Sequence, residues 1–185
     1  FSLLFSQVID QVEPLFPVRI LFICLFVLLL CITYYGNGIY IASIIIATYT
    51  NLPDDRDNKN IQRLATNILH GPLSHYFIYS GWLLLFFLLA LVEILFPNNP
   101  STIPWQIYGI GGAVVGVAYA VAQIYNRSFF YQLLTGITVV LSLYILTTIL
   151  HTPIDLYPIA NFFFALSVTF AIVLIGFISS KRKFR

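Results

Sequence analysis

A short polar segment concentrates three of the seven acidic residues of the chain. It covers residues 51–59, with the sequence NLPDDRDNK. Carboxylate and amide oxygens are typical ligands of Mg²⁺, which also coordinates the phosphate groups of substrates. The candidate residues for a metal or diphosphate site are Asn51, Asp54, Asp55 and Asp57. Because Arg56 and Lys59 offset much of this negative charge, a solvated loop without a ligand is the alternative interpretation.

Small residues recur at every fourth position in a later apolar stretch. Gly112, Gly116 and Ala120 would lie along one side of a helix. Small side chains allow two helices to approach closely inside a bilayer, where lipid provides no hydrophobic drive for their association. We therefore expect this stripe to serve helix packing rather than ligand binding.

The end of the sequence is strongly basic and contains no carboxylate side chain. Its cations are Lys181, Arg182, Lys183 and Arg185. Each Lys or Arg near an anionic membrane surface contributes about 1 kcal/mol to binding. These residues are therefore predicted to contact lipid headgroups, and the acidic surface of a partner protein is a second use for the same charge.

The three histidines raise the question of a haem site. His70 and His75 lie near one end of a predicted span, whereas His151 lies at the opposite end of another. Ligation of one haem by two histidines requires both imidazoles at the same depth. Side chains five residues apart are expected on different faces of a regular α-helix, so the sequence does not favour haem ligation by this pair.

Glu93 and Asp155 are acidic residues beside or within apolar stretches. A carboxylate inside the bilayer is a hint of function. Both residues fall near the predicted ends of spans, where a charge costs less. A structural role is therefore the preferred interpretation, and a transport pathway is the alternative.

The composition determines the kind of element that must position these residues. Of 185 residues, 59% are hydrophobic and only 9% are charged, and the mean hydropathy is +0.91. Soluble domains carry about 25% charged residues, so a soluble domain and a disordered chain are both excluded. Two cysteines exclude a disulfide scaffold, and a net charge of +2 gives no basis for a nucleic-acid partner. The sequence predicts an all-α protein, a polytopic transmembrane helical bundle.

Five apolar stretches are close to the length of about 20 residues that a bilayer requires. They cover residues 17–35, 72–96, 104–125, 128–150 and 156–179. Residues 38–50 are apolar but fewer, and the triplet of Gly36, Asn37 and Gly38 is a turn signal. We therefore expect a hairpin at this triplet and about six spans, with one longer helix and five spans as the alternative.

The distribution of Lys and Arg favours six spans. With both termini inside, six spans would place every Lys and Arg on the cytoplasmic side, in line with the positive-inside rule, whereas five spans would leave Arg19 on the other side. We predict an integral membrane protein whose two termini are both cytoplasmic. Residues 1–16 are predicted to form an interfacial amphipathic helix, residues 17–180 a single transmembrane domain and residues 181–185 a basic cytoplasmic tail.

The acidic segment resembles the first aspartate motif of the UbiA-type membrane prenyltransferase superfamily. That motif reads Asn-x-x-x-Asp-x-x-x-Asp and follows the second helix, and Asn51 and Asp55 match its first two positions. Lys59 stands at the third position, while Gly71, Pro72, Leu73 and Ser74 resemble the conserved end of the loop. The resemblance implies Mg²⁺-dependent transfer of an isoprenoid from its diphosphate to an acceptor ring.

A second similarity lies further along the chain, and a departure lies at its end. The segment from Gly116 to Ala120, followed by Asn126 and Arg127, resembles the family's Gly-x-x-Tyr-Ser segment and its Lys-Arg bend. The second acidic motif of the family is replaced here by the basic stretch 179–185. Opposed acidic clusters are needed to hold the metal ions of the reaction.

Three functions follow from these observations. The preferred one is a UbiA-like subunit without catalysis, which contacts lipid, an isoprenoid or a pigment together with other membrane subunits. The first alternative is a Mg²⁺-dependent prenyltransferase, present as a partial chain or half of an enzyme. The second alternative is a small transporter or channel component that uses Glu93 and Asp155.

Overall fold

The computed structural model describes residues 16–49, 66–96, 104–126, 128–151 and 153–183, and this part of the chain contains helices only. Five of its helices are long and apolar enough to cross a membrane. They are α2 (Phe16–Tyr49), α4 (Ser74–Leu95), α5 (Trp105–Tyr125), α6 (Phe129–Ile149) and α7 (Pro158–Lys183). A π-helix, η2 (Thr66–Leu73), leads directly into α4, and a short 3-10 helix, η3 (Ile154–Leu156), precedes α7. The predicted all-α class is thus confirmed.

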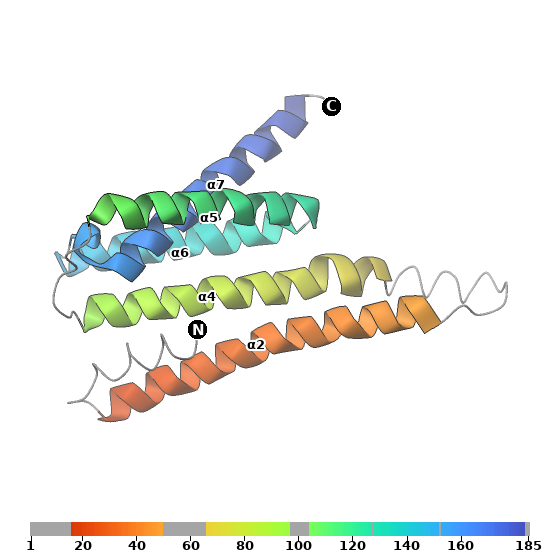
Figure 1. Ribbon diagram of the computed structural model, residues 1–185, viewed down its shortest axis with the longest axis horizontal. Helices are drawn as coiled ribbons and strands as arrows, with labels where there is room; N and C mark the ends of the chain where they lie inside the picture. Colours follow the sequence, from red (N-terminus) through yellow and green to blue (C-terminus); the bar gives the residue numbers. More distant parts are fainter. Residues whose placement is uncertain (1–15, 50–65, 97–103, 127, 152, 184–185) are drawn as a thin grey trace.

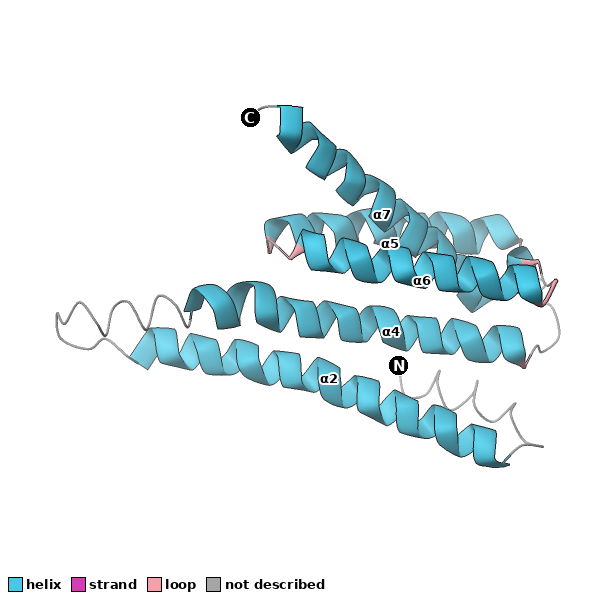
Figure 2. Ribbon diagram, turned by 180° about the vertical axis from the view of Figure 1, so that it is seen from behind, coloured by secondary structure: helices cyan, strands magenta, loops and turns pink. Residues whose placement is uncertain are grey.

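The helix α4 lies in the middle of the bundle (Figures 1 and 2). α2 packs along one side of α4, and α5, α6 and α7 lie on the other side. α7 is inclined to the other helices and makes its most extensive contact with α5. The chain runs in the same direction in both helices, because Gly109 of α5 faces Asn161 of α7 and Gly116 faces Leu166.

Two groups of buried side chains hold α4 between its neighbours. On one side, Phe22 and Phe26 of α2 pack against buried leucines of α4. On the other side, the fully buried rings of Phe163 and Phe170 belong to a cluster that α4, α5, α6 and α7 build together. Many large apolar side chains on the outer faces of α2, α5 and α6 are exposed. Such surfaces are expected of helices that face lipid chains.

The hairpin predicted at Gly36, Asn37 and Gly38 is wrong, because α2 runs through these residues as one helix of 34 residues. At 1.5 Å per residue it is about 51 Å long, whereas the hydrocarbon core of a bilayer is about 30 Å thick. α2 must therefore tilt or extend beyond this core. The described part of the chain offers five candidate spans, in place of the six that we expected.

Local contacts explain why the triplet continues the helix. The side-chain amide of Asn37 donates to the carbonyl of Thr33, one turn earlier, at 3.2 Å, so it finds a partner without a turn. Gly36 is buried against α4, and a Cβ atom there would lie 2.8 Å from the backbone nitrogen of Ile78. The glycine serves the close approach of two helices, rather than a reversal of the chain.

A continuous α2 changes where the start of α2 lies relative to the end of α7. The start of α2 and the end of α7 lie at opposite ends of the bundle (Figure 1). Arg19, near the start of α2, is therefore remote from the basic end of α7. The predicted interfacial helix at residues 1–16 lies outside the described residues except for Phe16, at which α2 begins.

The junction between η2 and α4 is an irregular part of the fold. Pro72 lies inside η2, and a proline in an α-helix removes one N–H donor and clashes with the carbonyl four residues earlier. The wider turn of a π-helix accommodates this residue. Where the α-helix resumes, the hydroxyl of Ser74 donates to the carbonyl of His70 at 2.8 Å. Because π-helical turns are frequent at functional sites, this junction is the first place to look for one.

Candidate functional site

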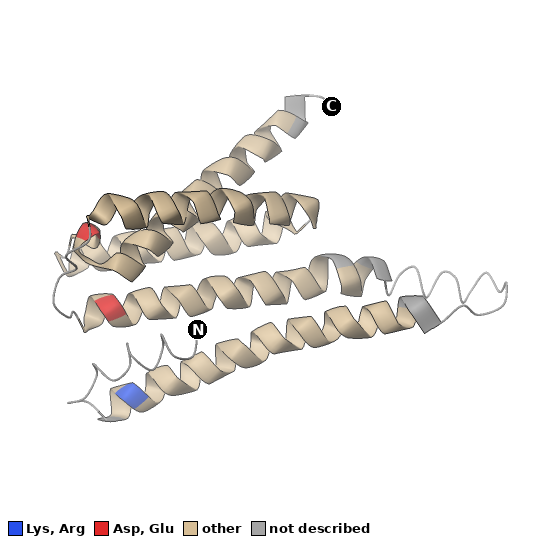
Figure 3. Cartoon of the chain, in the orientation of Figure 1, with Lys and Arg blue, Asp and Glu red and all other residues tan. Residues whose placement is uncertain are grey.

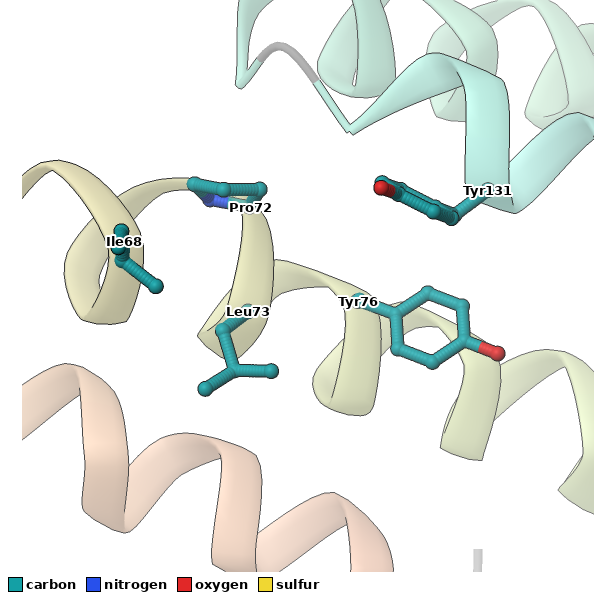
Figure 4. A pocket seen from close by; sticks show the side chains of 5 residues that line it. All are labelled: Ile68, Pro72, Leu73, Tyr76 and Tyr131. Carbon is teal, nitrogen blue, oxygen red and sulfur yellow. The ribbon is translucent and has the colours of Figure 1, made fainter.

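A pocket of about 460 Å³ lies beside the π-helix (Figure 4). Its walls come from η2, from the start of α4 and from α6: Ile68, Pro72, Leu73, Tyr76 and Tyr131. The rings of Tyr76 and Tyr131 meet edge to face, with their centroids 5.8 Å apart. Ligand pockets typically measure about 300–1,000 Å³ and have largely apolar walls. This pocket therefore has the size and chemistry to hold part of an apolar or flat molecule.

Buried hydrogen bonds hold the two sides of this pocket together. Gln132, next to Tyr131, is fully buried and donates to the carbonyl of Tyr76 and to the hydroxyl of Ser80, both at 3.1 Å. These bonds join α6 to α4 at the two pocket tyrosines. Inside a membrane no water competes for such donors, so the contact fixes the relative position of the two walls.

Two histidines and two tyrosines form a second cluster at the same junction. The ring of Tyr40, from α2, stacks on His70 with a centroid separation of 4.6 Å. His75 stacks on Tyr79 at 5.8 Å and also contacts Tyr40. The two imidazoles lie 6.3 Å apart, with an angle of 78° between their planes. We call these four residues the histidine cluster.

The prediction that His70 and His75 lie on different faces of a helix is wrong. It assumed a regular α-helix, in which residues five apart diverge. A π-helix closes its hydrogen bonds between residues i and i+5, and η2 ends only two residues before His75. The wider turn brings both imidazoles to the side of the helix that faces α2.

Tyr79 connects the histidine cluster to α5. Its carbonyl accepts a hydrogen bond from the hydroxyl of Tyr119 at 2.5 Å, and its own hydroxyl accepts one from the amide of Asn126 at 3.1 Å. The ring of Tyr119 in turn contacts Phe170 of α7. The ring against which His75 stacks is therefore held by contacts that reach across the bundle.

At the other end of the bundle, Glu93 caps the first turn of α7. Its two carboxyl oxygens accept hydrogen bonds from the backbone N–H groups of Ile159 and Ala160, at 3.2 and 2.8 Å. These N–H groups have no partner within their own helix, and the start of a helix favours negative charge. Asp155, in η3, lies at the same end and is exposed (Figure 3). Glu93 thus has a specific structural contact, and Asp155 remains at the surface.

The small-residue stripe of α5 lies in the bundle. Gly112, Gly116 and Ala120 are all buried. A Cβ atom on Gly112 would collide with the carbonyl oxygen of Phe162, and one on Gly116 would lie 2.5 Å from that of Leu166. α5 and α7 therefore approach more closely at the two glycines than a larger residue would allow.

The remaining predicted site residues are not brought together by the described structure. Asn51, Asp54, Asp55 and Asp57 lie outside the described residues, so the Mg²⁺ or diphosphate site stays a prediction. Lys181, Arg182 and Lys183 belong to the last turn of α7, and Arg185 lies outside the described residues. Among the side chains that the structure describes, no three His, Cys, Asp or Glu residues form a metal-binding group.

Sequence reasoning missed the pocket tyrosines and the proximity of His70 and His75. Tyr76 and Tyr131 belong to no motif, and they are 55 positions apart in the sequence. The useful signal was Pro72, because the apolar span begins before it, at Ile68, and continues to Leu95. A proline inside a continuous helix indicates a local distortion, and both sites lie at that distortion.

Comparisons with protein-family models, with curated proteins and with solved structures found no match to this chain.

Proposed function

We propose that this chain is an integral membrane subunit that binds an isoprenoid, a lipid chain or a pigment without catalysis, within a larger membrane assembly. The observation that carries this proposal is the pocket formed by η2, α4 and α6. A lining of three aliphatic side chains and two tyrosines favours a long or flat apolar molecule over an ion or a sugar. The UbiA resemblance of the sequence supports an isoprenoid as the first candidate.

The surface of the bundle is compatible with partner subunits. Among the elements that the structure describes, α2 makes its substantial contacts with α4 and η2. Its outer face carries large exposed apolar side chains, among them Leu21, Leu28 and Tyr34. This face suits lipid as well as the helix of another membrane protein. For the orientation, we propose that the end of the bundle where α7 terminates faces the cytoplasm, because eight of the nine Lys and Arg residues belong to segments attached to that end.

Photoaffinity labelling tests the pocket. The purified chain in lipid nanodiscs is exposed to an isoprenoid alcohol that carries a diazirine, and the labelled peptides are mapped by mass spectrometry. We expect labelling to concentrate at residues 68–76 and near Tyr131, and an excess of the unlabelled isoprenoid to suppress it. Labelling spread evenly over the lipid-facing surface of α2 would contradict the proposal.

A matched pair of variants on α6 sharpens this test. Tyr131→Ala removes one wall of the pocket and is expected to reduce labelling at residues 68–76. Tyr144→Ala is the control, because Tyr144 is exposed on the same helix to a similar extent, 61% against 56%, and does not line the pocket. Equal labelling of the two variants would remove the pocket as the binding site.

A further inference from the structure

We propose that His70 and His75 form a binding site for a divalent transition-metal ion that accepts two opposed nitrogen ligands, such as Cu²⁺. Imidazole nitrogen is a preferred ligand of such ions. With metal–nitrogen bonds of about 2.0–2.1 Å, the centroids of two imidazoles on one ion lie about 5.2 Å apart at a tetrahedral angle and about 6.4 Å apart when the two nitrogens are on opposite sides of the ion. The observed separation of 6.3 Å between the two rings matches the opposed arrangement, which the square-planar geometry of Cu²⁺ allows.

Hydrogen bonds determine which nitrogen of His70 is available. The hydroxyl of Ser43 lies 3.0 Å from Nδ1 of His70 and donates its single proton to the carbonyl of Tyr40 at 2.6 Å. In the tautomer that satisfies both contacts, Nδ1 donates to Ser43 and the neutral ring carries a lone pair on Nε2. Histidines that bind metals commonly donate their other N–H group to an oxygen in this way. The contact with Ser43 thus orients His70 as a ligand.

The environment of His75 suits the same role. Its ring is held by stacking on Tyr79 and by contact with Tyr40, and neither nitrogen has a hydrogen-bond partner among the described residues. Its nitrogens are therefore available to an ion. Two protein ligands leave the other coordination positions to water, as in metal sites that keep open positions.

The proposed metal site is separate from the apolar pocket. Neither histidine lines that pocket, although both features arise from the same π-helix. The pocket includes Tyr131 of α6, whereas the histidine cluster includes Tyr40 of α2. The metal proposal therefore stands whether or not an apolar ligand binds.

Titration with Cu²⁺ tests the site on the full chain in detergent. Paramagnetic resonance of the bound ion reports how many nitrogens coordinate it, and we expect two imidazole nitrogens at one equivalent of Cu²⁺. His70→Ala and His75→Ala should each leave one nitrogen and weaken binding by about 100-fold, because the second ligand no longer acts at a high effective concentration.

Two further variants separate a built site from incidental binding. His151→Ala is the control, since His151 is exposed at the other end of the bundle, and it should leave affinity and spectrum unchanged. Ser43→Ala removes no ligand but releases the orientation of His70, so we expect about tenfold weaker binding with two nitrogens retained. Loss of copper binding in His151→Ala, or an unchanged spectrum in both His70→Ala and His75→Ala, would overturn the proposal.

Discussion

The carboxyl group of Glu93 illustrates how a charged residue is accommodated near the end of an apolar helix. It has two backbone donors from α7 as partners, so the cost of partial burial is offset by charge-assisted hydrogen bonds. The sequence identified Glu93 as a residue near the end of a span. It could not identify the partner, because Ile159 lies 66 positions further along the chain.

We expect Glu93→Gln to lower the free energy of unfolding by about 1–2 kcal/mol. The amide offers one acceptor oxygen in place of two, and it loses the favourable interaction of a negative charge with the start of α7. Thermal unfolding in detergent, followed by circular dichroism, measures the change.

Asp155→Asn is the control for the Glu93 variant. It removes a negative charge near the same helix start, but Asp155 is exposed and lies in η3, outside the cap. Its effect should stay within about 0.5 kcal/mol, as for most surface substitutions. Equal destabilisation by both variants would show that net charge, rather than the cap, is responsible.

At the scale of the helices, glycines determine how closely the elements pack. The small residues that the sequence places along one side of a helix are buried in α5. Sequence reasoning failed at Gly36 and Gly38, where the glycines were read as a turn. The distinction depends on the neighbouring helix, since only the fold reveals that Gly36 lies against Ile78.

The neighbouring glycines of α5 provide a direct test of its contact with α7. Gly112→Ala should destabilise the protein by about 1–3 kcal/mol, because the added Cβ meets the carbonyl oxygen of Phe162 and the helices must move apart. Gly111→Ala is the matched control, since its Cβ would lie 3.5 Å from the ring of Phe162, an ordinary contact.

In the control, the higher helix propensity of alanine should leave stability unchanged or raise it by up to about 1 kcal/mol. Thermal unfolding in detergent measures both variants. If Gly111→Ala were as destabilising as Gly112→Ala, the close approach at Gly112 would not explain the stability of this contact.

The π-helix is the feature at this scale that could not be predicted from the sequence. The apolar composition is sufficient to predict long helices, since a bilayer requires internally bonded backbones. The wider helical turn at Pro72 depends on packing against the surrounding helices, and a hydropathy pattern does not predict such packing. Both the pocket and the histidine cluster depend on that widening, so they were not predictable from residue spacing.

At the scale of the whole molecule, the central difference from the sequence-based expectation is the number of spans. A single α2 gives five candidate spans and places Arg19 at the end opposite to the end of α7. The positive-inside argument favoured six spans, because it required Arg19 to lie on the same side of the membrane as the basic residues at the carboxyl end. The unfavourable placement of the single cation Arg19 is a weaker argument about the number of spans than the extensive packing of α2 against α4.

The accessibility of single cysteines in sealed vesicles tests this arrangement most directly. Cys24 and Cys31 are first replaced by serine, and Pro17→Cys, Asp155→Cys and Ser180→Cys are then introduced one at a time. With a membrane-impermeant maleimide, we expect Pro17→Cys and Asp155→Cys to react from one side of the membrane and Ser180→Cys from the other side. Reaction of Pro17→Cys and Ser180→Cys from the same side would contradict a single α2 and the five-span bundle.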